Sequence, residues 1–356
     1  MTIGLPSIKI QFKEAILRTA LRTGRGIVAI ILDDTTGAGV YDIYDLNDIP
    51  SNLNEKNKKY LEWALEGFGA RPVKVIAYVK LSDTPLKTAL DYLEGVQFNV
   101  ITAPHCDNEG LVELESFVNK LCTNYFEVFG VLGTKTVKPT TENIIYVTFE
   151  DAKIKEETIT PAELAVIVSG MLAGCPNPFS LTYATVPFLT DIPKLSKEAL
   201  SGRIDKGEIV LITECGDIRI ARGVTSFTAE SETKGYSYRK IKTVDTMKMI
   251  KNDIILNLKS NYVGKVTNSY DNKLLVCGMI SDYLHELAKI GLIENEYSAE
   301  IDLEAQKKFL KTILGDKVNT MTDDEILAEP TKDKAFFRVA IKLLDTMEDI
   351  EIICNI

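Results

Sequence analysis

The chain of 356 residues carries 51 acidic and 41 basic residues, a formal net charge of −10, and 45% of its residues are hydrophobic. This composition is ordinary for a globular protein of two or three domains and excludes disordered, collagen-like and coiled-coil chains. The acidic balance argues against binding to bulk nucleic acid. Apolar runs such as residues 26–32 are far shorter than the roughly 18–20 residues that span a bilayer, so no membrane insertion is expected.

Targeting and metal-binding signals are missing from the sequence. The first six residues lack a basic segment followed by an apolar one, so the chain is expected to be cytosolic when made. Six cysteines are scattered and form no CxxC pair, which predicts reduced thiols rather than a zinc site or a disulfide framework. We therefore expect neither a metal nor a cofactor.

Strand and helix patterns alternate through the first half of the chain. Near its start, Ile8, Ile10 and Phe12 alternate with polar residues and predict a strand. Further strands are expected at residues 26–32, 73–79, 98–103, 128–132 and 144–149. Helices are expected at residues 55–68, 86–93, 111–126 and 160–171. Repeated units of this kind predict a mainly parallel sheet with helices on its faces, which is the α/β class.

The second half begins with a loop rich in Pro and Thr and then mixes strands with helices, so the whole chain is α+β. Strands are expected at residues 208–213, 217–221, 236–244 and 335–344, the first two joined by a hairpin turn at Cys215-Gly216. Helices are expected at residues 244–262, 272–290 and 303–314. At the end, Ile350, Ile352 and Cys354 share one face and predict a terminal strand. A strand there is unusual, because chain ends fray unless something ties them down.

Candidate catalytic groups are few. His105 follows one predicted strand and Asp33 follows another, at the edge where open α/β sheets place their active sites. An α/β enzyme with a loop site near His105 is therefore the alternative hypothesis. The glycines of residues 130–136 have the wrong spacing for a phosphate loop. No combination of nucleophile, base and oxyanion site is found.

The distribution of charge along the chain is uneven. Residues 236–265 carry seven basic and two acidic residues, a local net charge of +5 that includes Lys248, Lys251 and Lys259. Residues 293–330 carry ten acidic and four basic residues, a local net charge of −6. A solvated helix surface is the ordinary explanation of such charges. The asymmetry between neighbouring segments also fits complementary surfaces in an assembly.

Several segments resemble contractile tail sheath proteins. They are GLPSI at 4–8, GRGIVA at 24–29, TVDTM at 243–247, YVGKVTN at 262–268 and LDTMEDI at 344–350. The order of these segments and the chain length extend the resemblance over essentially the whole chain. It is strongest to sheaths from phages, prophages and R-type bacteriocins, or diffocin-like particles, of Gram-positive, clostridia-like bacteria.

The resemblance implies a structural subunit rather than an enzyme. Such subunits form six-fold rings stacked helically around an inner tube, and the sheath contracts to drive the tube through a target cell envelope. The implied partners are other copies of the chain, the inner tube protein, and baseplate and terminator or collar proteins, without cofactor or nucleic acid. Assembly would take place in the bacterial cytoplasm, with release on lysis.

The resemblance also implies a division of the chain into five parts. They are an N-terminal arm at 1–24, an N-terminal α/β subdomain at 25–95, an outward-facing α/β domain of subtilisin-like topology without its triad at 96–235, an inner tube-facing domain at 236–343, and a C-terminal arm at 344–356. The arms would add strands to neighbouring subunits through Ile8, Ile10 and Phe12 at one end and Ile350, Ile352 and Cys354 at the other. Pairing of both strands within their own subunit is the alternative. We further hypothesise that Lys248, Lys251 and Lys259 face the tube.

Overall fold

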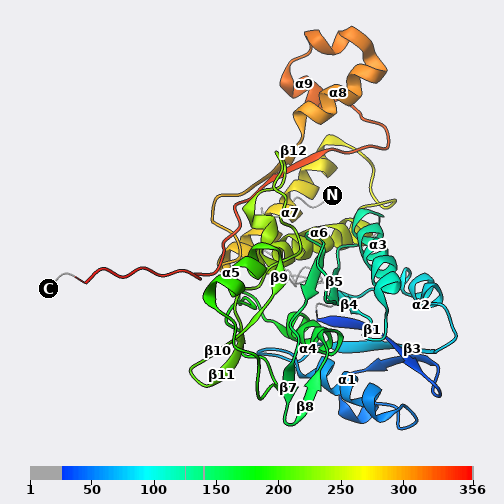
Figure 1. The fold of residues 1–356 in the computed structure, drawn as a ribbon. Helices are drawn as coiled ribbons and strands as arrows, with labels where there is room; N and C mark the ends of the chain where they lie inside the picture. Colours follow the sequence, from blue (N-terminus) through cyan, green and yellow to red (C-terminus); the bar gives the residue numbers. More distant parts are fainter. Residues whose placement is uncertain (1–25, 125, 139–140, 355–356) are drawn as a thin grey trace, which may run out of the picture.

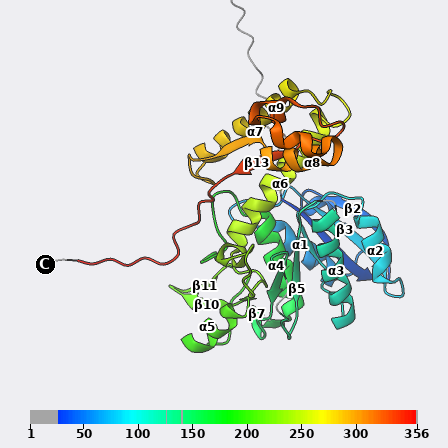
Figure 2. The ribbon, with the colours of Figure 1, turned by 90° about the horizontal axis from the view of Figure 1, so that it is seen from above.

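The computed structural model describes residues 26–124, 126–138 and 141–354 (Figure 1). The predicted strand of Ile8, Ile10 and Phe12 lies outside these residues and stays a prediction. Figures 1 and 2 show a body that contains a sheet, a helical part beside it, and an extended C-terminal segment that leaves both.

Within the described residues, the body is built on a seven-stranded sheet in the order β2-β3-β1-β4-β5-β6-β9. Its strands are β1 (Ile27–Asp34), β2 (Gly39–Ile43), β3 (Lys74–Leu81), β4 (Val100–Thr102), β5 (Phe129–Gly133), β6 (Ile144–Val147) and β9 (Glu208–Ile209). Neighbouring strands are parallel, except that β2 pairs antiparallel to β3. The predicted α/β class with a mainly parallel sheet is therefore confirmed.

Both faces of the sheet are covered by helices. These are α1 (Glu55–Glu66), α2 (Leu86–Leu93), α3 (Asn108–Asn124) and α4 (Pro161–Gly174). Alternate residues of β1 pack into two different cores. Val28, Ile30 and Leu32 join the core that contains α1 and α4, and Ile27, Ala29 and Ile31 join the core that contains α2 and α3. An unbroken apolar run in β1 is the expected sequence of a strand that is buried on both faces.

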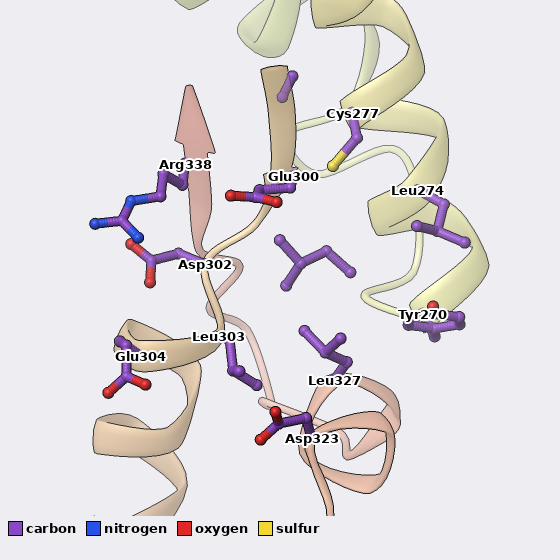
Figure 3. Close-up of a pocket in the computed structure, with 12 residues that line it drawn as sticks. Tyr270, Leu274, Cys277, Glu300, Asp302, Leu303, Glu304, Asp323, Leu327 and Arg338 are labelled. Atoms are coloured by element: carbon purple, nitrogen blue, oxygen red, sulfur yellow. The ribbon is translucent and has the colours of Figure 1, made fainter. Parts of the chain in front are cut away.

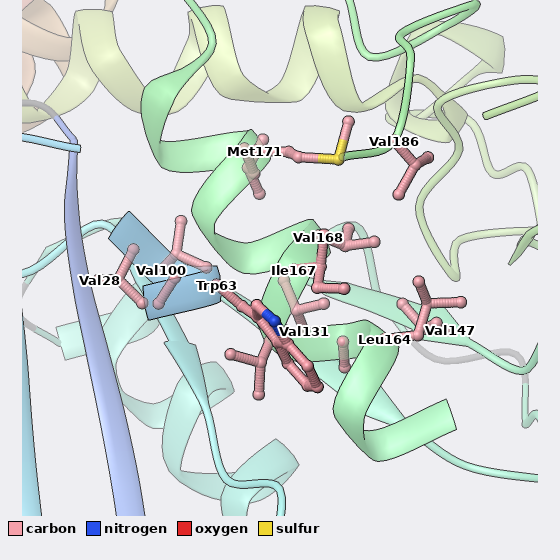
Figure 4. Packing of buried hydrophobic residues seen from close by; sticks show 14 of the residues in the cluster. Val28, Trp63, Val100, Val131, Val147, Leu164, Ile167, Val168, Met171 and Val186 are labelled. Atoms are coloured by element: carbon pink, nitrogen blue, oxygen red, sulfur yellow. The ribbon is translucent and has the colours of Figure 1, made fainter. Parts of the chain in front are cut away.

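Helix α4 is buried on nearly all sides and lies at the centre of the larger core (Figure 4). Figure 4 shows its apolar side chains among those of the sheet strands and of Trp63 from α1. The approach of α1 to α4 depends on Gly170. A Cβ atom added there would lie 2.5 Å from the backbone oxygen of Ala64.

The N-terminus of α4 is closed by a capping box. The Thr160 hydroxyl accepts from the backbone N–H of Glu163, and the Glu163 carboxylate accepts from the backbone N–H of Thr160. The same carboxylate accepts from the Tyr60 hydroxyl at 3.0 Å and pairs with Lys56 at 2.9 Å. Burial raises the pKa of Glu163, but the hydrogen bonds from Thr160 and Lys56 outweigh it and lower that pKa below its ordinary value.

Shorter elements complete the body. They are η1 (Leu46–Asp48), β7 (Ala152–Ile154), β8 (Glu157–Ile159), α5 (Lys197–Asp205), β10 (Leu211–Glu214) and β11 (Asp217–Ile220). The predicted hairpin around Cys215-Gly216 is confirmed, because β10 and β11 pair antiparallel across it. Both turn residues have positive φ, 55° for Cys215 and 89° for Gly216, as a tight hairpin turn requires.

The C-terminal part is mainly helical. It consists of η2 (Tyr236–Arg239), α6 (Ile241–Asn261), α7 (Tyr270–Lys289), β12 (Ser298–Ile301), α8 (Leu303–Leu314), η3 (Gly315–Thr320), α9 (Asp323–Ala328) and β13 (Phe337–Ala340). β12 and β13 form a two-stranded antiparallel sheet, and α8 and α9 form a tip far from the large sheet (Figure 1). After β13 the chain passes back along the body and leaves it as an extended segment.

Two strand predictions differ from the structure. The predicted strand at 236–244 is wrong: residues 236–239 form the 3-10 helix η2, and α6 begins at Ile241. The residues from 240 to 244 are all buried, so the alternating pattern of exposure that the prediction assumed does not exist there. At the C-terminus, residues 350–354 form no strand, because no other strand of the described chain lies beside them to supply hydrogen bonds.

The expected boundary between residues 95 and 96 does not divide the structure. The large sheet takes β1, β2 and β3 from one side of it and β4, β5, β6 and β9 from the other. β1 pairs with β3 and with β4, so residues 27–209 share one continuous sheet. The sequence prediction also missed the short elements β2, β7, β8, α5, β12 and α9.

Candidate assembly site

At the carboxyl end of β1, the enzyme hypothesis's His105 is joined through Asn57 to Asp34, the neighbour of Asp33. The Asp34 carboxylate accepts from the backbone N–H of Asn54 and from the Asn57 side-chain amide, each at 2.9 Å. The oxygen of that amide lies 2.9 Å from Nε2 of His105. Burial raises the pKa of Asp34, but these hydrogen bonds lower it overall, while burial lowers the pKa of His105. The network fixes the first turn of α1 to the end of β1.

This polar cluster has the geometry of a structural network. The Asp33 carboxylate forms an ion pair with Lys80 at 2.8 Å, so its charge is neutralised within the subunit. Beside His105, burial raises the pKa of the Cys106 thiol to about 12, which keeps it protonated and poorly nucleophilic. Throughout the described residues, no group of three or more His, Cys, Asp or Glu side chains is arranged to hold a metal ion.

The basic residues of α6 have different environments. Lys248 is 6% exposed, and its ammonium group contacts Asn143 and pairs with Glu127 at 3.1 Å. Lys251 binds the same carboxylate while half exposed, and Lys259, near the end of α6, is exposed. Burial raises the pKa of Glu127, but the two lysines lower it overall. Lys248 therefore lies inside the subunit and joins α6 to the loop before β5, which corrects the expectation of an exposed contact.

A cluster of opposite charges holds the root of the C-terminal segment, and we call it the clasp. Lys240 pairs with Asp345 at 2.6 Å and with Glu348 at 3.1 Å. Arg222 pairs with Asp349 at 2.6 Å. Glu348 also accepts from the Thr182 hydroxyl at 2.9 Å and is only 5% exposed. The clasp thus fixes the place where the chain leaves the body.

Beyond the clasp the chain has little contact with the body (Figures 1 and 2). Ile350, Ile352 and Ile353 are 72%, 78% and 80% exposed, and Cys354 is exposed as well. A run of exposed isoleucines is costly in water and marks a segment that another surface covers. A clasped arm that exposes apolar side chains is a feature typical of structural subunits.

Comparison with known proteins identifies the family. The family model of the phage tail sheath C-terminal domain matches residues 233–355. A tail sheath protein of Clostridium phage phiCD119 is 36% identical over 357 residues, which covers 98% of each chain. The chain belongs to the tail sheath protein family. This is a family of structural proteins, so the chain is a contractile tail sheath subunit and not an enzyme, and the enzyme hypothesis around His105 is set aside.

Solved structures share the fold. The sheath tail protein from Desulfitobacterium hafniense superposes with a TM-score of 0.68 at 14% identity, over 97% of this chain and 100% of that chain. The sheath complex of the extracellular contractile injection system PVC, in its contracted state, gives a TM-score of 0.64 at 15% identity, over 100% of this chain and 98% of that one. Among the helices described here, none is long and apolar enough to cross a membrane.

The sequence marked residues 344–356 as a separate segment but did not reveal the clasp that holds its root. The acidic side chains at its root, Asp345, Glu348 and Asp349, are visible in the sequence as a cluster. Their partners Arg222 and Lys240 are more than 100 residues away, and only the fold brings them together. The signal that could have predicted the clasp is this cluster of acidic residues just before the apolar C-terminal residues. Acidic side chains that are held against the body need basic partners there.

Proposed function

We propose that the chain polymerises as six-fold rings stacked helically around an inner tube, and that contraction of this lattice drives the tube through a target cell envelope. The observation that carries the proposal is the clasped C-terminal arm with its exposed isoleucines. Membership of the tail sheath family supports it. The energy of contraction would come from intersubunit contacts formed as the lattice rearranges, without nucleotide or cofactor.

The arms link neighbouring subunits in this proposal. Residues 350–354 are extended, and Ile350, Ile352 and Cys354 alternate with the other side chains, so one face is available to fill pockets on a neighbour. Each main-chain hydrogen bond gained by strand addition contributes a net of about 0.5–1.5 kcal/mol. The clasp holds the root while the arm bends beyond it, so that connected subunits move as rigid bodies.

The remaining parts have proposed positions in the sheath. Residues 236–343 would face the tube, and residues 96–235 would face outward. Lys259 is the best candidate for a tube contact, because its side chain is exposed, whereas Glu127 neutralises Lys248 and Lys251 within the subunit. The tube protein, baseplate proteins and a terminator or collar protein would be the other partners. Assembly would take place in the cytoplasm of the bacterial host, before release on lysis.

The test is coexpression of the chain with its tube protein, followed by negative-stain electron microscopy. The wild-type chain should give hollow cylinders, and Ile350→Ser with Ile352→Ser should abolish them. A matched control replaces Val112, which is 54% exposed on α3, with Ser and should assemble normally. Uniform globules from the wild-type chain with its tube would contradict the proposal. If Lys259→Glu still forms normal cylinders, Lys259 does not contribute to the tube contact.

A further inference from the structure

A pocket of about 390 Å³ lies where the C-terminal segment leaves the body. It is lined by the half-buried ring of Phe68, just after α1, and by the exposed side chains of Phe179, Tyr183 and Met347. Met347 is 90% exposed and directly precedes Glu348, the buried acid of the clasp, which lines the same pocket. Large apolar side chains left in water around a pocket mark a surface that another segment covers.

The described chain begins beside this pocket. Gly26 precedes β1, and its carbonyl accepts from the backbone N–H of Val73 at 2.7 Å. A Cβ atom added to Gly26 would lie 3.0 Å from the backbone oxygen of Ala173. One added to the next residue, Gly174, would lie 3.0 Å from the backbone nitrogen of Phe68. The segment before Gly26 therefore starts close to the lining of the pocket.

Residues 14–23, which lie outside the described residues, have the sequence pattern of an amphipathic helix. The apolar residues are spaced as on one helix face: Ile16, Leu17, Ala20 and Leu21. The charged residues recur at every fourth position on the opposite face: Glu14, Arg18 and Arg22. Gly24 follows as a signal for the end of a helix. A helix of this length is marginal by itself in water, so it forms only if its apolar face is covered.

We propose that residues 14–23 form a helix whose apolar face docks in the pocket between Phe68 and Met347 of the same subunit. Leu21 is five residues from Gly26, and five extended residues span at most about 18 Å. A larger groove of about 570 Å³ lies between α7, β12 and α9 (Figure 3). That groove belongs to the helical part, and α9 is far from the large sheet in which β1 lies (Figure 1). Reach therefore favours the pocket beside the clasp.

The docked helix would bring the roots of the two terminal arms together. It would cover Met347 at the root of the C-terminal arm and leave only residues 1–13 free at the other end. A free arm of 13 residues spans at most about 45 Å, whereas one of 24 residues would span about 80 Å. The docking concerns a single subunit and does not rest on the proposed sheath function.

Hydrogen exchange of the full-length chain tests this docking at the backbone amides of residues 18–22. It is measured at a concentration at which sedimentation shows single chains. The docked helix should slow exchange at these amides at least tenfold relative to an unstructured chain. Phe179→Ser with Met347→Ser should remove this protection, and the fold should persist because both side chains are exposed. The control, Tyr92→Ser with Val112→Ser, changes two exposed side chains on α2 and α3 and should keep the protection.

Three results would overturn the proposal. The first is exchange at the rate of an unstructured chain in the wild type. The second is protection that survives in the variant with Phe179→Ser and Met347→Ser, because the segment would then dock elsewhere. The third is protection that falls on dilution, which would show a contact with a second copy. The measurement needs no cylinders, so failure of the docking and failure of the sheath function are distinguished.

Discussion

Replacement of Glu348 by alanine tests whether the clasp fixes the direction of the arm. The substitution removes the hydrogen bond from the Thr182 hydroxyl, the ion pair with Lys240 and a longer ion pair with Arg222 at 3.8 Å. Lys240 keeps Asp345, and Arg222 keeps Asp349, so the arm loses one of its three acidic contacts. A hydrogen bond to a charged group contributes about 1.5–3 kcal/mol, and the remaining partner of Lys240 places the loss near the lower end, at about 2 kcal/mol.

A loss of about 2 kcal/mol raises the population of the released arm about 30-fold. Hydrogen exchange measures this population, because the backbone N–H of Leu344 donates to the carbonyl of Leu292 at 3.0 Å only while the root is in place. We expect exchange at Leu344 about 30-fold faster in Glu348→Ala than in the wild-type chain.

The control is Glu351→Ala, which removes an exposed acid beyond the clasp and should leave exchange at Leu344 unchanged. Equal exchange rates in the two variants would refute the reasoning. The pairing of Leu344 with Leu292 would then hold the root alone, and the charges around Glu348 would contribute nothing to the direction of the arm.

Three further predictions concern stability and are measured by urea unfolding. Gly170→Ala should lower the free energy of unfolding by about 3 kcal/mol, because its Cβ would meet the backbone of α1, whereas Gly278→Ala, which has open space on α7, should raise it by up to about 1 kcal/mol. Lys248→Ala should cost about 3 kcal/mol by breaking a buried ion pair, and Lys259→Ala less than about 0.5 kcal/mol. The pKa of Glu163 is lower in the folded chain than its ordinary 4.5, so its stabilising contribution is present above that pH and lost as the pH falls through the folded value. In Glu163→Gln the free energy of unfolding should therefore fall less as the pH is lowered. If its pH dependence is the same as in the wild-type chain, the Glu163 carboxylate does not contribute to the loss of stability in acid.

The sequence predicted well those elements whose burial has a simple period. β1 is apolar from Ile27 to Leu32 because it is covered on both faces, and α2 and α8 were placed with their observed bounds. These elements take their partners from the same subunit. The period of the hydrophobic pattern is then enough to predict both the type of each element and its position in the sequence.

Elements at the junction of the two parts were harder to predict. Residues 240–244 are buried whatever their polarity, since Lys240 lies in the clasp and Lys242 contacts the Asn177 side chain. Local pattern cannot show that tertiary contacts will bury a lysine. The same cause misplaced Lys248, whose charge suggested an exposed surface but whose partner Glu127 lies in a distant segment. Opposite charges far apart in the sequence are matched only by the fold.

The C-terminal strand shows a different limit. Residues 350–354 alternate as a strand does, yet within the described chain they pair with nothing and expose their isoleucines. An alternating pattern records burial of one face, and the described part of this subunit supplies no surface that buries it. Under the sheath proposal the pattern belongs to the assembled state, in which a neighbour supplies both the edge and the pockets.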